Sequence, residues 1–316
     1  MKINKVTLTS FRNYRRQTIE LGSGIHFIIG GNGEGKTNFL EALYVLALAK
    51  SYKADDSDLI MYGADFSRIQ ASIEREDRKT DLTMIITEIG KKAIRDGQEI
   101  KRLSDYIGIL NIVSFLPEDI YLVKGSPRER RYYTDVFLGQ IDKKYLNDLS
   151  EYKHVLKQRN ELLKKMAMVE KPDYELLDVL TEQLAAPAER ITARRAKFQE
   201  EINQTISNIY NRFSDKNEKF TLTYQPSMPL DDPTGFLKGK YRQDIIQGTT
   251  GYGPHRDDYA FMIGNFQANA HASQGEQRMM VLSLNMSLAG MIKKTAKETP
   301  VFLLDDVFSE LDNIRQ

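Results

Sequence analysis

The stretch "IHFIIGGNGEGKTNF", residues 25–39, contains the most specific motif of the chain. Five mostly apolar residues run directly into a group of glycines, and Lys36-Thr37 then opens a helical pattern over residues 38–49. Residues 30–37 match G-x-x-x-x-G-K-S/T at every fixed position. The stretch therefore predicts a buried strand, a phosphate-binding loop and a helix, as in nucleotide-binding α/β proteins.

The residue types in this loop suit a nucleoside triphosphate. Glycines let backbone N–H groups curl around phosphate oxygens, and the helix N-terminus adds positive potential. Lys36 is expected to reach the β- and γ-phosphates, and the Thr37 hydroxyl to ligate Mg²⁺. A glycine-rich turn with a surface lysine is the alternative, but the motif is long and correctly placed. The predicted ATP-binding residues are Gly30, Gly31, Asn32, Gly33, Glu34, Gly35, Lys36, Thr37 and Asn38.

A second motif supplies the acid that a phosphate loop needs for its metal. "VFLLDD", residues 301–306, is an apolar strand pattern that ends in two carboxylates. Asp305 is the predicted Mg²⁺-side acid, and Asp306 is predicted to orient or deprotonate the attacking water. Alone, the run fits any interior strand that meets solvent at an acidic turn. Paired with the phosphate loop, it predicts the catalytic set Lys36, Asp305 and Asp306.

The stretch "SQGEQ", residues 273–277, also reads as the start of a helix. Ser273 and Glu276 fit an S-x-x-E capping box, which explains the segment without any ligand. The capping box does not explain Gly275, because glycine in a helix costs about 1 kcal/mol relative to alanine. The stretch resembles the signature motif of ABC-type ATPases, whose serine and glycine contact the γ-phosphate bound by the other subunit. The resemblance implies that Ser273 and Gly275 contact ATP and that Ser273, Gln274, Gly275 and Glu276 lie at a dimer interface.

Composition restricts the class of protein. The 316 residues include 45 Lys+Arg and 44 Asp+Glu, so a polyanion would have to meet a local patch. The chain has no cysteine, which excludes disulfides and thiolate metal sites. The longest apolar run, residues 42–49, is too short to span a bilayer. We expect a cytoplasmic protein without a membrane partner.

The pattern along the chain predicts an α/β fold in three parts. Residues 1–115 show strand patterns around one helix, with Asp96-Gly97 as a hairpin turn. Residues 116–215 show two long amphipathic helices, the second of which Pro187 should kink or split. Residues 216–316 return to strands. The expected architecture is an ABC-type ATPase head with a mixed sheet, completed by both ends of the chain, and an inserted helical arm.

Several motifs together resemble the RecF family, bacterial recombination mediators that are ABC-type ATPases related to SMC proteins. They are "FRNY" at 11–14, "GGNGEGKTN" at 30–38, "FLPEDIYLVKGSPRERRYYTD" at 115–135, "GPHRDD" at 253–258, "SQGEQ" at 273–277 and "LLDDVFSELD" at 303–312. The resemblance implies ATP-dependent dimerisation on DNA, weak DNA-dependent ATP hydrolysis, and work with RecO and RecR to load RecA at gaps. It implies nucleotide contacts from Arg12 and Asn13, for which a solvated turn is the alternative, and an interface loop that includes Asp312. DNA partners would be duplexes and single-strand/duplex junctions.

Two departures from the family pattern affect the expected activity. Asp306 stands where most ABC ATPases have glutamate, and its shorter reach is consistent with slow turnover. The chain stops at Gln316, before the switch histidine that the family places later. We therefore expect a truncated form that binds ATP but hydrolyses it poorly.

The DNA-contacting residues and the function class are less well determined by sequence. The candidate phosphate contacts are Arg128, Arg130, Arg131, Arg194 and Arg195, although charged runs on helices are usually solvated. Two other functions fit the phosphate loop: the nucleotide-binding subunit of another ATP-driven machine, such as a transporter or an SMC-like complex, and a small-molecule kinase. The inserted helices disfavour the transporter subunit, and a kinase would give Ser273 no role.

Overall fold

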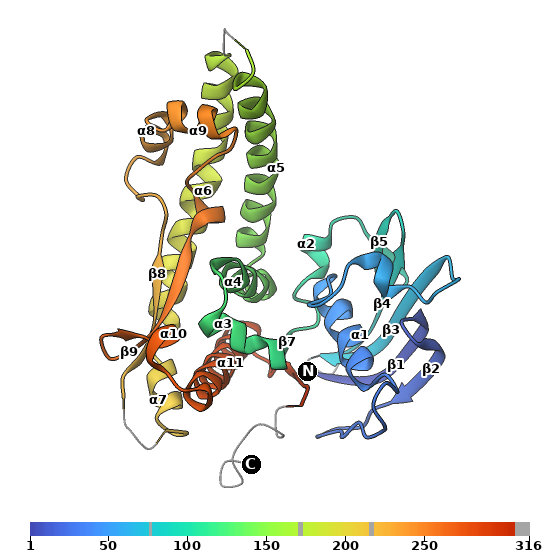
Figure 1. The fold of residues 1–316 in the computed structure, drawn as a ribbon. Coiled ribbons are helices and arrows are strands. Elements are labelled where there is room, and N and C mark those ends of the chain that lie inside the picture. Colours follow the sequence, from blue (N-terminus) through green and yellow to red (C-terminus); the bar gives the residue numbers. More distant parts are fainter. Residues whose placement is uncertain (76–77, 170–172, 215–217, 307–316) are drawn as a thin grey trace. The chain divides into compact units, whose positions relative to one another are not determined.

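The computed structural model describes residues 1–75, 78–169, 173–214 and 218–306, which form two compact units (Figure 1). The first, here the head unit, comprises Met1–Asp119, Gly139–Ile141 and Asn285–Gln316. The second, here the arm unit, comprises Ile120–Leu138 and Asp142–Leu284. These units divide the chain at other positions than the predicted boundary at 216, because the strands after the long helices pack within the arm unit.

A six-stranded antiparallel sheet in the order β2-β1-β3-β4-β5-β6 forms much of the head unit. Alternate side chains of its long strands are buried, as the period-two pattern predicted. Asp96 and Gly97 both have positive φ, 50° and 80°, in the tight turn between β5 and β6. The strands are β1 (Lys2–Phe11), β2 (Tyr14–Glu20), β3 (Phe66–Arg75), β4 (Arg78–Thr87), β5 (Gly90–Arg95) and β6 (Gln98–Ile100).

A second, parallel pair of strands in the head unit joins distant parts of the sequence. β7 (Ile112–Phe115) pairs with β11 (Val301–Leu304), and Val301 lies opposite Ile112. The expectation that both ends of the chain complete one sheet is therefore wrong for the described residues, because β1 and β11 belong to different sheets. The helices that begin in this unit are α1 (Lys36–Leu48), η1 (Asp56–Leu59), α2 (Leu103–Tyr106) and η2 (Pro117–Ile120).

The predicted strand before the phosphate loop does not form. Residues 25–29 are irregular, and Ile25, Phe27 and Ile29 are 83%, 76% and 91% exposed. An apolar run becomes a buried strand only when neighbouring strands satisfy its backbone groups. No strand among the described residues pairs with this segment.

Two antiparallel helices dominate the arm unit: α5 (Lys143–Met166) and α6 (Tyr174–Asn203) (Figure 1). Their apolar residues at 3-to-4 spacing form the predicted seam, and Leu163, Met166 and Leu177 pack together where the two helices end and begin. Pro187 does not split α6, which continues through it as one helix of 30 residues. The buried seam residues include Tyr145, Leu149, Tyr152, Leu180, Leu184, Ile191, Phe198 and Ile202.

The remaining elements of the arm unit pack around these helices. A three-stranded sheet in the order β10-β9-β8 brings Phe220 and Phe261 into a stacked pair at 6.0 Å. No helix in the described residues is both long and apolar enough to cross a membrane. The elements are α3 (Tyr121–Lys124), α4 (Pro127–Ile141), α7 (Ile206–Tyr210), β8 (Phe220–Gln225), α8 (Pro233–Lys238), α9 (Tyr241–Gln247), η3 (Pro254–Arg256), β9 (Asp258–Ile263), β10 (Phe266–Gln267) and α10 (Ala268–His271). The long helix α11 (Gln274–Ala296) begins in this unit and ends in the head unit.

Candidate functional site

The glycine-rich loop leads into α1 as the motif predicted. Gly35, with φ of 103°, is the N-cap residue, and the helix begins at Lys36. Gly33 also has a left-handed backbone, with φ of 82°, a conformation that residues other than glycine rarely adopt. The Lys36 ammonium donates to the carbonyl oxygens of Gly30 and Gly31, each at 2.8 Å. The Lys36 side chain thus lies against the loop that is predicted to bind the phosphates of ATP.

The second motif meets the loop at the start of α1. The Thr37 hydroxyl donates to Asp305 Oδ1 at 3.4 Å, and the Asp305 N–H donates to the Phe115 carbonyl at 3.0 Å. The β11–β7 pairing therefore carries the acid to the helix. Asp306 follows with a left-handed backbone, φ 52°, and an exposed side chain.

The Thr37–Asp305 pair is chemically suited to Mg²⁺. This ion takes one or two protein oxygens and completes its shell with water and phosphate oxygens. A threonine hydroxyl beside an aspartate carboxylate supplies such oxygens. Among the described residues, no group of three His, Cys, Asp or Glu side chains is placed to hold a metal by itself.

Two titratable groups of the head unit with raised pKa values were not among the predicted site residues. Burial raises the pKa of the Tyr52 hydroxyl, and the negative charge of Asp305 raises it further. Burial raises the pKa of Asp119 to about 7, against the opposing effect of the Leu116 N–H that its carboxylate accepts at 2.9 Å. Neither residue belongs to a sequence motif for phosphate chemistry, and only the folded arrangement connects Tyr52 with Asp305.

The "SQGEQ" stretch forms the capping box that its sequence allows. The Ser273 N–H and hydroxyl both donate to Glu276 Oε2 at 2.8 Å, and Ser273 Oγ accepts the Glu276 N–H at 3.3 Å. Gly275 remains unexplained by these contacts, because a Cβ added there would meet nothing within 4 Å. Ser273, Gln274 and Gly275 are exposed at the start of α11. Asp312, the other predicted interface residue, lies outside the described residues.

Four of the five arginines that were predicted to contact DNA have carboxylate or carbonyl partners within the arm unit. Arg195 is 1% exposed and donates to Asp257 at 2.9 Å and Asp135 at 2.8 Å. The other three arginines are partly buried. Arg130 pairs with Asp258 at 2.7 and 3.0 Å, and Arg131 donates to the Asp257 carbonyl at 2.7 Å. Arg194 pairs with Asp142 at 2.9 Å and with Glu201 at 3.2 Å. Arg128 alone of the five is exposed, with no side-chain partner among the described residues.

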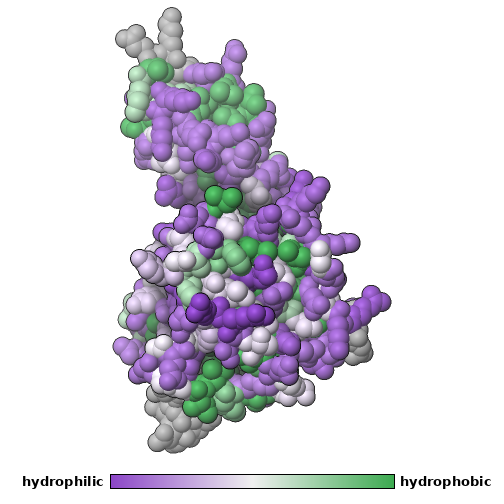
Figure 2. Space-filling model, turned by 90° about the vertical axis from the view of Figure 1, so that its right-hand side faces the viewer, coloured by the Kyte–Doolittle hydropathy of each residue, from purple (hydrophilic) through white to green (hydrophobic). Residues whose placement is uncertain are grey.

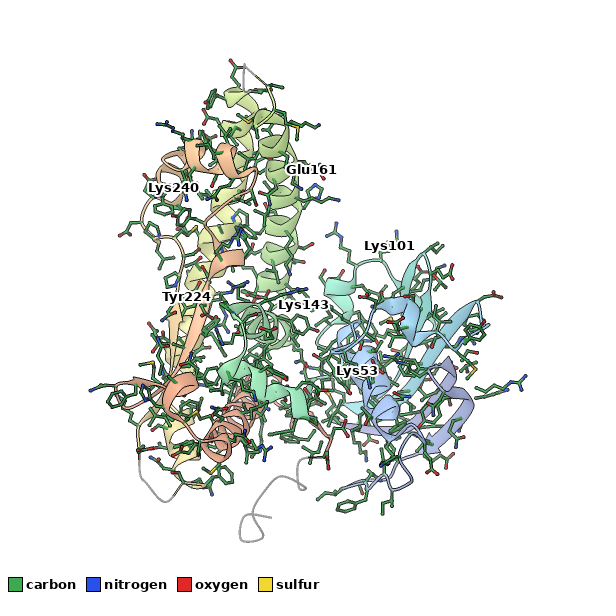
Figure 3. All side chains as sticks on the ribbon, in the orientation of Figure 1. Lys53, Lys101, Lys143, Glu161, Tyr224 and Lys240 are labelled. Atoms are coloured by element: carbon green, nitrogen blue, oxygen red, sulfur yellow. The ribbon has the colours of Figure 1, made fainter. Side chains whose placement is uncertain are left out.

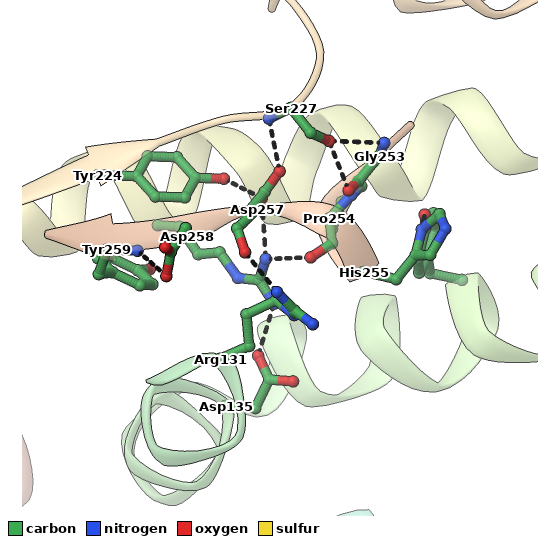
Figure 4. A network of polar contacts seen from close by, with 12 residues as sticks. Arg131, Asp135, Tyr224, Ser227, Gly253, Pro254, His255, Asp257, Asp258 and Tyr259 are labelled. Atoms are coloured by element: carbon green, nitrogen blue, oxygen red, sulfur yellow. Dashed lines mark hydrogen bonds and ion pairs between the residues drawn. The ribbon is translucent and has the colours of Figure 1, made fainter. Parts of the chain in front are cut away.

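The same contacts give the "GPHRDD" stretch a structural role within the arm unit, through hydrogen bonds and an ion pair that we call the Arg195–Asp257 clasp. Asp257 is fully buried and accepts from Arg195, from the Tyr224 hydroxyl and from the Ser227 N–H (Figure 4). A buried charge is tolerated only when it is paired and hydrogen-bonded, as both Arg195 and Asp257 are here. This clasp ties α6 to η3 and β9.

The phosphate loop, the acid at the end of β11 and the inserted arm define an ABC-type ATPase fold. Residues 2–316 match the family model described as "RecF/RecN/SMC N terminal domain". Two relatives named DNA replication and repair protein RecF, from Staphylococcus carnosus and Shouchella clausii, are 40% and 41% identical, covering 100% of this chain and 88% of each relative. The chain belongs to the RecF family.

Solved structures agree with this assignment. A structure described as "recombination mediator protein RecF-ATP in RecFOR pathway" has a TM-score of 0.94 at 29% identity, covering 99% of this chain and 87% of that one. A second, described as RecF-ATPrS, has a TM-score of 0.92 at the same identity and coverage. The family assignment confirms the RecF resemblance and favours it over the transporter-subunit and kinase interpretations.

Proposed function

We propose that the chain is an ATP-dependent switch of DNA repair that forms homodimers on DNA, with each ATP held between two chains. The phosphate loop and the Thr37–Asp305 pair would hold ATP and Mg²⁺, and Asp306 would act on the attacking water in weak, DNA-dependent hydrolysis. RecO and RecR would be its partners, as the naming of the RecF structures after the RecFOR pathway supports. The place of action would be the cytoplasm.

The exposed start of α11 carries the dimer proposal. Its capping box uses Ser273 and Glu276, but nothing within the described residues uses the open space at Gly275. A helix N-terminus without a side chain at its first turn lets an anion approach the backbone closely. The γ-phosphate bound to the loop of a second chain is the occupant we propose. Arg12 donates to Glu41 and Asn13 donates to the Glu34 carbonyl, so both side chains have partners within the head unit.

For DNA, we propose the exposed face of α5 in place of the arginines that have partners within the arm unit. α5 has seven Lys and Arg against three Asp and Glu, a net charge of +4, whereas α6 has four against six, a net charge of −2. The lysines are exposed at both ends of the helix; Figure 3 labels Lys143 at its start and Glu161 closer to its end. The exposed lysines are Lys143, Lys144, Lys153, Lys157, Lys164 and Lys165.

The length and polarity of α5 suit a phosphate backbone. With 24 residues the helix is about 36 Å long, close to one helical turn of duplex DNA. On the α5 side, the arm presents a largely hydrophilic surface, with apolar side chains near its tip (Figure 2). Among the described residues, Lys143, Lys157 and Lys164 have no ion-pair partner, so their charges remain available. Such contacts would position the protein on DNA with little base specificity.

Molecular mass in solution tests the proposal. Light scattering would be measured without nucleotide, with ATP and Mg²⁺, and with both ligands plus duplex DNA. We expect a monomer, a dimer and a DNA-bound dimer, respectively. A Lys36→Ala chain is the matched control and should remain monomeric in ATP. An unchanged monomer mass at saturating ATP would refute the dimeric switch, whereas a dimer that ignores DNA would refute only its DNA-binding part.

A further inference from the structure

Three consecutive side chains, from the turn between β1 and β2 and the first residue of β2, reach the phosphate loop and α1. The Asn13 side-chain N–H donates to the Glu34 carbonyl at 3.2 Å, and the Tyr14 hydroxyl donates to the Gly35 carbonyl at 3.0 Å. Asn13 Oδ1 also accepts the Asn38 side-chain N–H at 3.0 Å. Asn13 and Tyr14 therefore hold two backbone carbonyl groups of the phosphate loop by hydrogen bonds.

Holding these carbonyls sets the direction of the amides that would face phosphate. The C=O of residue 34 and the N–H of residue 35 belong to one planar peptide unit, in which they point in opposite directions when the bond is trans. The chain has no cis peptide bond in its described part. A donor that fixes the Glu34 carbonyl therefore fixes the Gly35 N–H, and one that fixes the Gly35 carbonyl fixes the Lys36 N–H. The Gly35 carbonyl also accepts the Phe39 N–H at 2.9 Å, so Tyr14 holds it together with the first turn of α1.

Gly35 is needed for this close approach. A Cβ at this position would lie 2.7 Å from Asn13 Nδ2 and 2.8 Å from Asn13 Oδ1, which is closer than non-bonded atoms can come. The glycine thus serves the turn as well as its own left-handed backbone.

Arg12 anchors the turn to α1. Its guanidinium donates to both carboxylate oxygens of Glu41, at 3.0 and 2.9 Å, and to the Asp58 carbonyl at 2.9 Å. Glu41 is fully buried in α1 and also accepts the Ser51 hydroxyl at 2.6 Å. The hydrogen bonds to Glu41 raise the pKa of Arg12. Arg12 has a left-handed backbone, φ 52°, which the surrounding contacts must hold in place.

We propose that Asn13 and Tyr14 are positioning residues that aim the Gly35 and Lys36 amides at the phosphates of a bound nucleotide, with Arg12 fixing the turn that carries them. This inference rests on the proposed ATP site and assigns these residues a role without contact to base or ribose. It also gives Tyr14 a function, although Tyr14 was absent from the predicted site.

Binding measurements on Asn13→Ala and Tyr14→Phe chains test the proposal. Calorimetry would give the affinity for ATP and for tripolyphosphate, which lacks base and ribose. Loss of one hydrogen bond should weaken both ligands by the same factor, about 2- to 10-fold. The matched control is Thr18→Val, which removes a hydroxyl pair at 3.1 Å between β1 and β2 far from the loop and should leave both affinities unchanged.

A spectroscopic measurement separates bracing from direct contact with phosphate. In ligand-free protein labelled with ¹⁵N-glycine, the Gly35 amide should become more mobile in Asn13→Ala than in the unsubstituted chain, because Asn13 holds the Glu34 carbonyl of the same peptide unit. An unchanged Gly35 signal, or a loss of affinity for ATP but not for tripolyphosphate, would overturn the proposal. So would a lower melting temperature without nucleotide combined with unchanged affinities. If the unsubstituted chain binds neither ligand, the ATP site itself fails, which is a distinguishable result.

Discussion

Thr37 Oγ1 lies 3.4 Å from Asp305 Oδ1, although 268 positions separate the two residues. The strand pair β7–β11 and the helix α1 bring this hydroxyl and this carboxylate together within the head unit. Their oxygens are the ones expected around a nucleotide-bound Mg²⁺. Removing either oxygen should therefore weaken ATP binding only when Mg²⁺ is present.

Thr37→Ala and Asp305→Asn should each weaken ATP binding by about 10- to 100-fold in Mg²⁺, because each removes a contact to a charged group. In EDTA the variants and the unsubstituted chain should bind ATP alike. Thr37→Ser keeps the hydroxyl and is the matched control. Titrations with both metal conditions check this prediction, and an equal loss in EDTA would show that the pair only supports the fold.

Ser273→Asp separates the capping role of Ser273 from its proposed phosphate contact. Aspartate accepts the Glu276 N–H as serine does, so α11 should still begin at the same residue, although the hydrogen bond from the Ser273 hydroxyl to Glu276 is lost. Its negative charge would repel the γ-phosphate of a second chain, and ATP should no longer produce a dimer. Light scattering measures the mass, and circular dichroism verifies the helix content. An ATP-dependent dimer of normal stability would contradict the shared site.

Mixing two defective chains extends this test to the geometry of the site. Lys36→Ala lacks a working loop, and Ser273→Asp lacks a working partner surface. One of the two sites in a mixed dimer combines the intact Lys36 of one chain with the intact Ser273 of the other. Light scattering should therefore recover some dimer in the ATP-containing mixture, although neither variant dimerises alone. If the mixture remains monomeric while labelled unsubstituted chains do form dimers, one intact site is insufficient.

Lysine substitutions on α5 should change how DNA binding depends on salt. Log affinity for duplex DNA falls linearly with log salt, with a slope of about −0.9 per phosphate contact. Replacing Lys143, Lys157 and Lys164 by glutamine should flatten the slope by up to about 3. Replacing Lys79, Lys92 and Lys219 removes the same charge elsewhere and should leave the slope nearly unchanged. Equal slopes in both triple variants would place the DNA surface off α5.

The sequence predicted those parts of the molecule that depend on local patterns. The 3-to-4 spacing that buries Leu163 and Leu177 marked the arm helices, and the Asp96-Gly97 pair marked the hairpin turn. The exposed segment 25–29 shows the limit of such patterns. Apolar composition indicates a strand, but pairing depends on partners elsewhere in the chain.

Long-range ion pairs were the part of the site that no local pattern could reveal. Arg195 was predicted to contact DNA, yet it meets Asp135 and Asp257, which lie 60 and 62 positions away. An arginine on a helix reads as a solvated charge until the fold shows which carboxylate lies opposite. Tyr14 was missed for the same reason, since its partner is a backbone carbonyl of the loop.

His255 should make the arm unit sensitive to acid. The Tyr152 hydroxyl lies 2.5 Å from His255 Nδ1, and His255 Nε2 lies 2.9 Å from the Thr250 carbonyl. A carbonyl only accepts, so Nε2 carries the proton and Nδ1 accepts from Tyr152 in the neutral ring. Burial and the positive charge of the neighbouring Arg256 lower the pKa of His255 to about 4, against the opposing effect of the hydrogen bond to the Thr250 carbonyl.

The sign of the effect follows from linkage. Between about pH 6.5 and pH 4 the unfolded chain binds a proton at His255 that the folded chain does not, so acid favours unfolding. The stability contribution is complete above pH 6.5, and up to about 3 kcal/mol is lost as the pH falls to 4. Asp119 has the opposite effect, because its pKa is raised in the folded protein. Its contribution to the free energy of unfolding is lost as the pH rises from about 4 to about 7.

The measurement is urea unfolding followed by far-UV circular dichroism, to which α5 and α6 contribute strongly, at pH values from 4 to 7. His255→Gln keeps a donor for the Thr250 carbonyl and an acceptor for Tyr152 but cannot titrate. Its free energy of unfolding should therefore fall less between pH 7 and pH 4 than that of the unsubstituted chain. His154→Gln removes an exposed histidine of α5 and should behave like the unsubstituted chain. A His255→Gln chain with an unchanged pH dependence would mean that the buried ring does not govern the acid response.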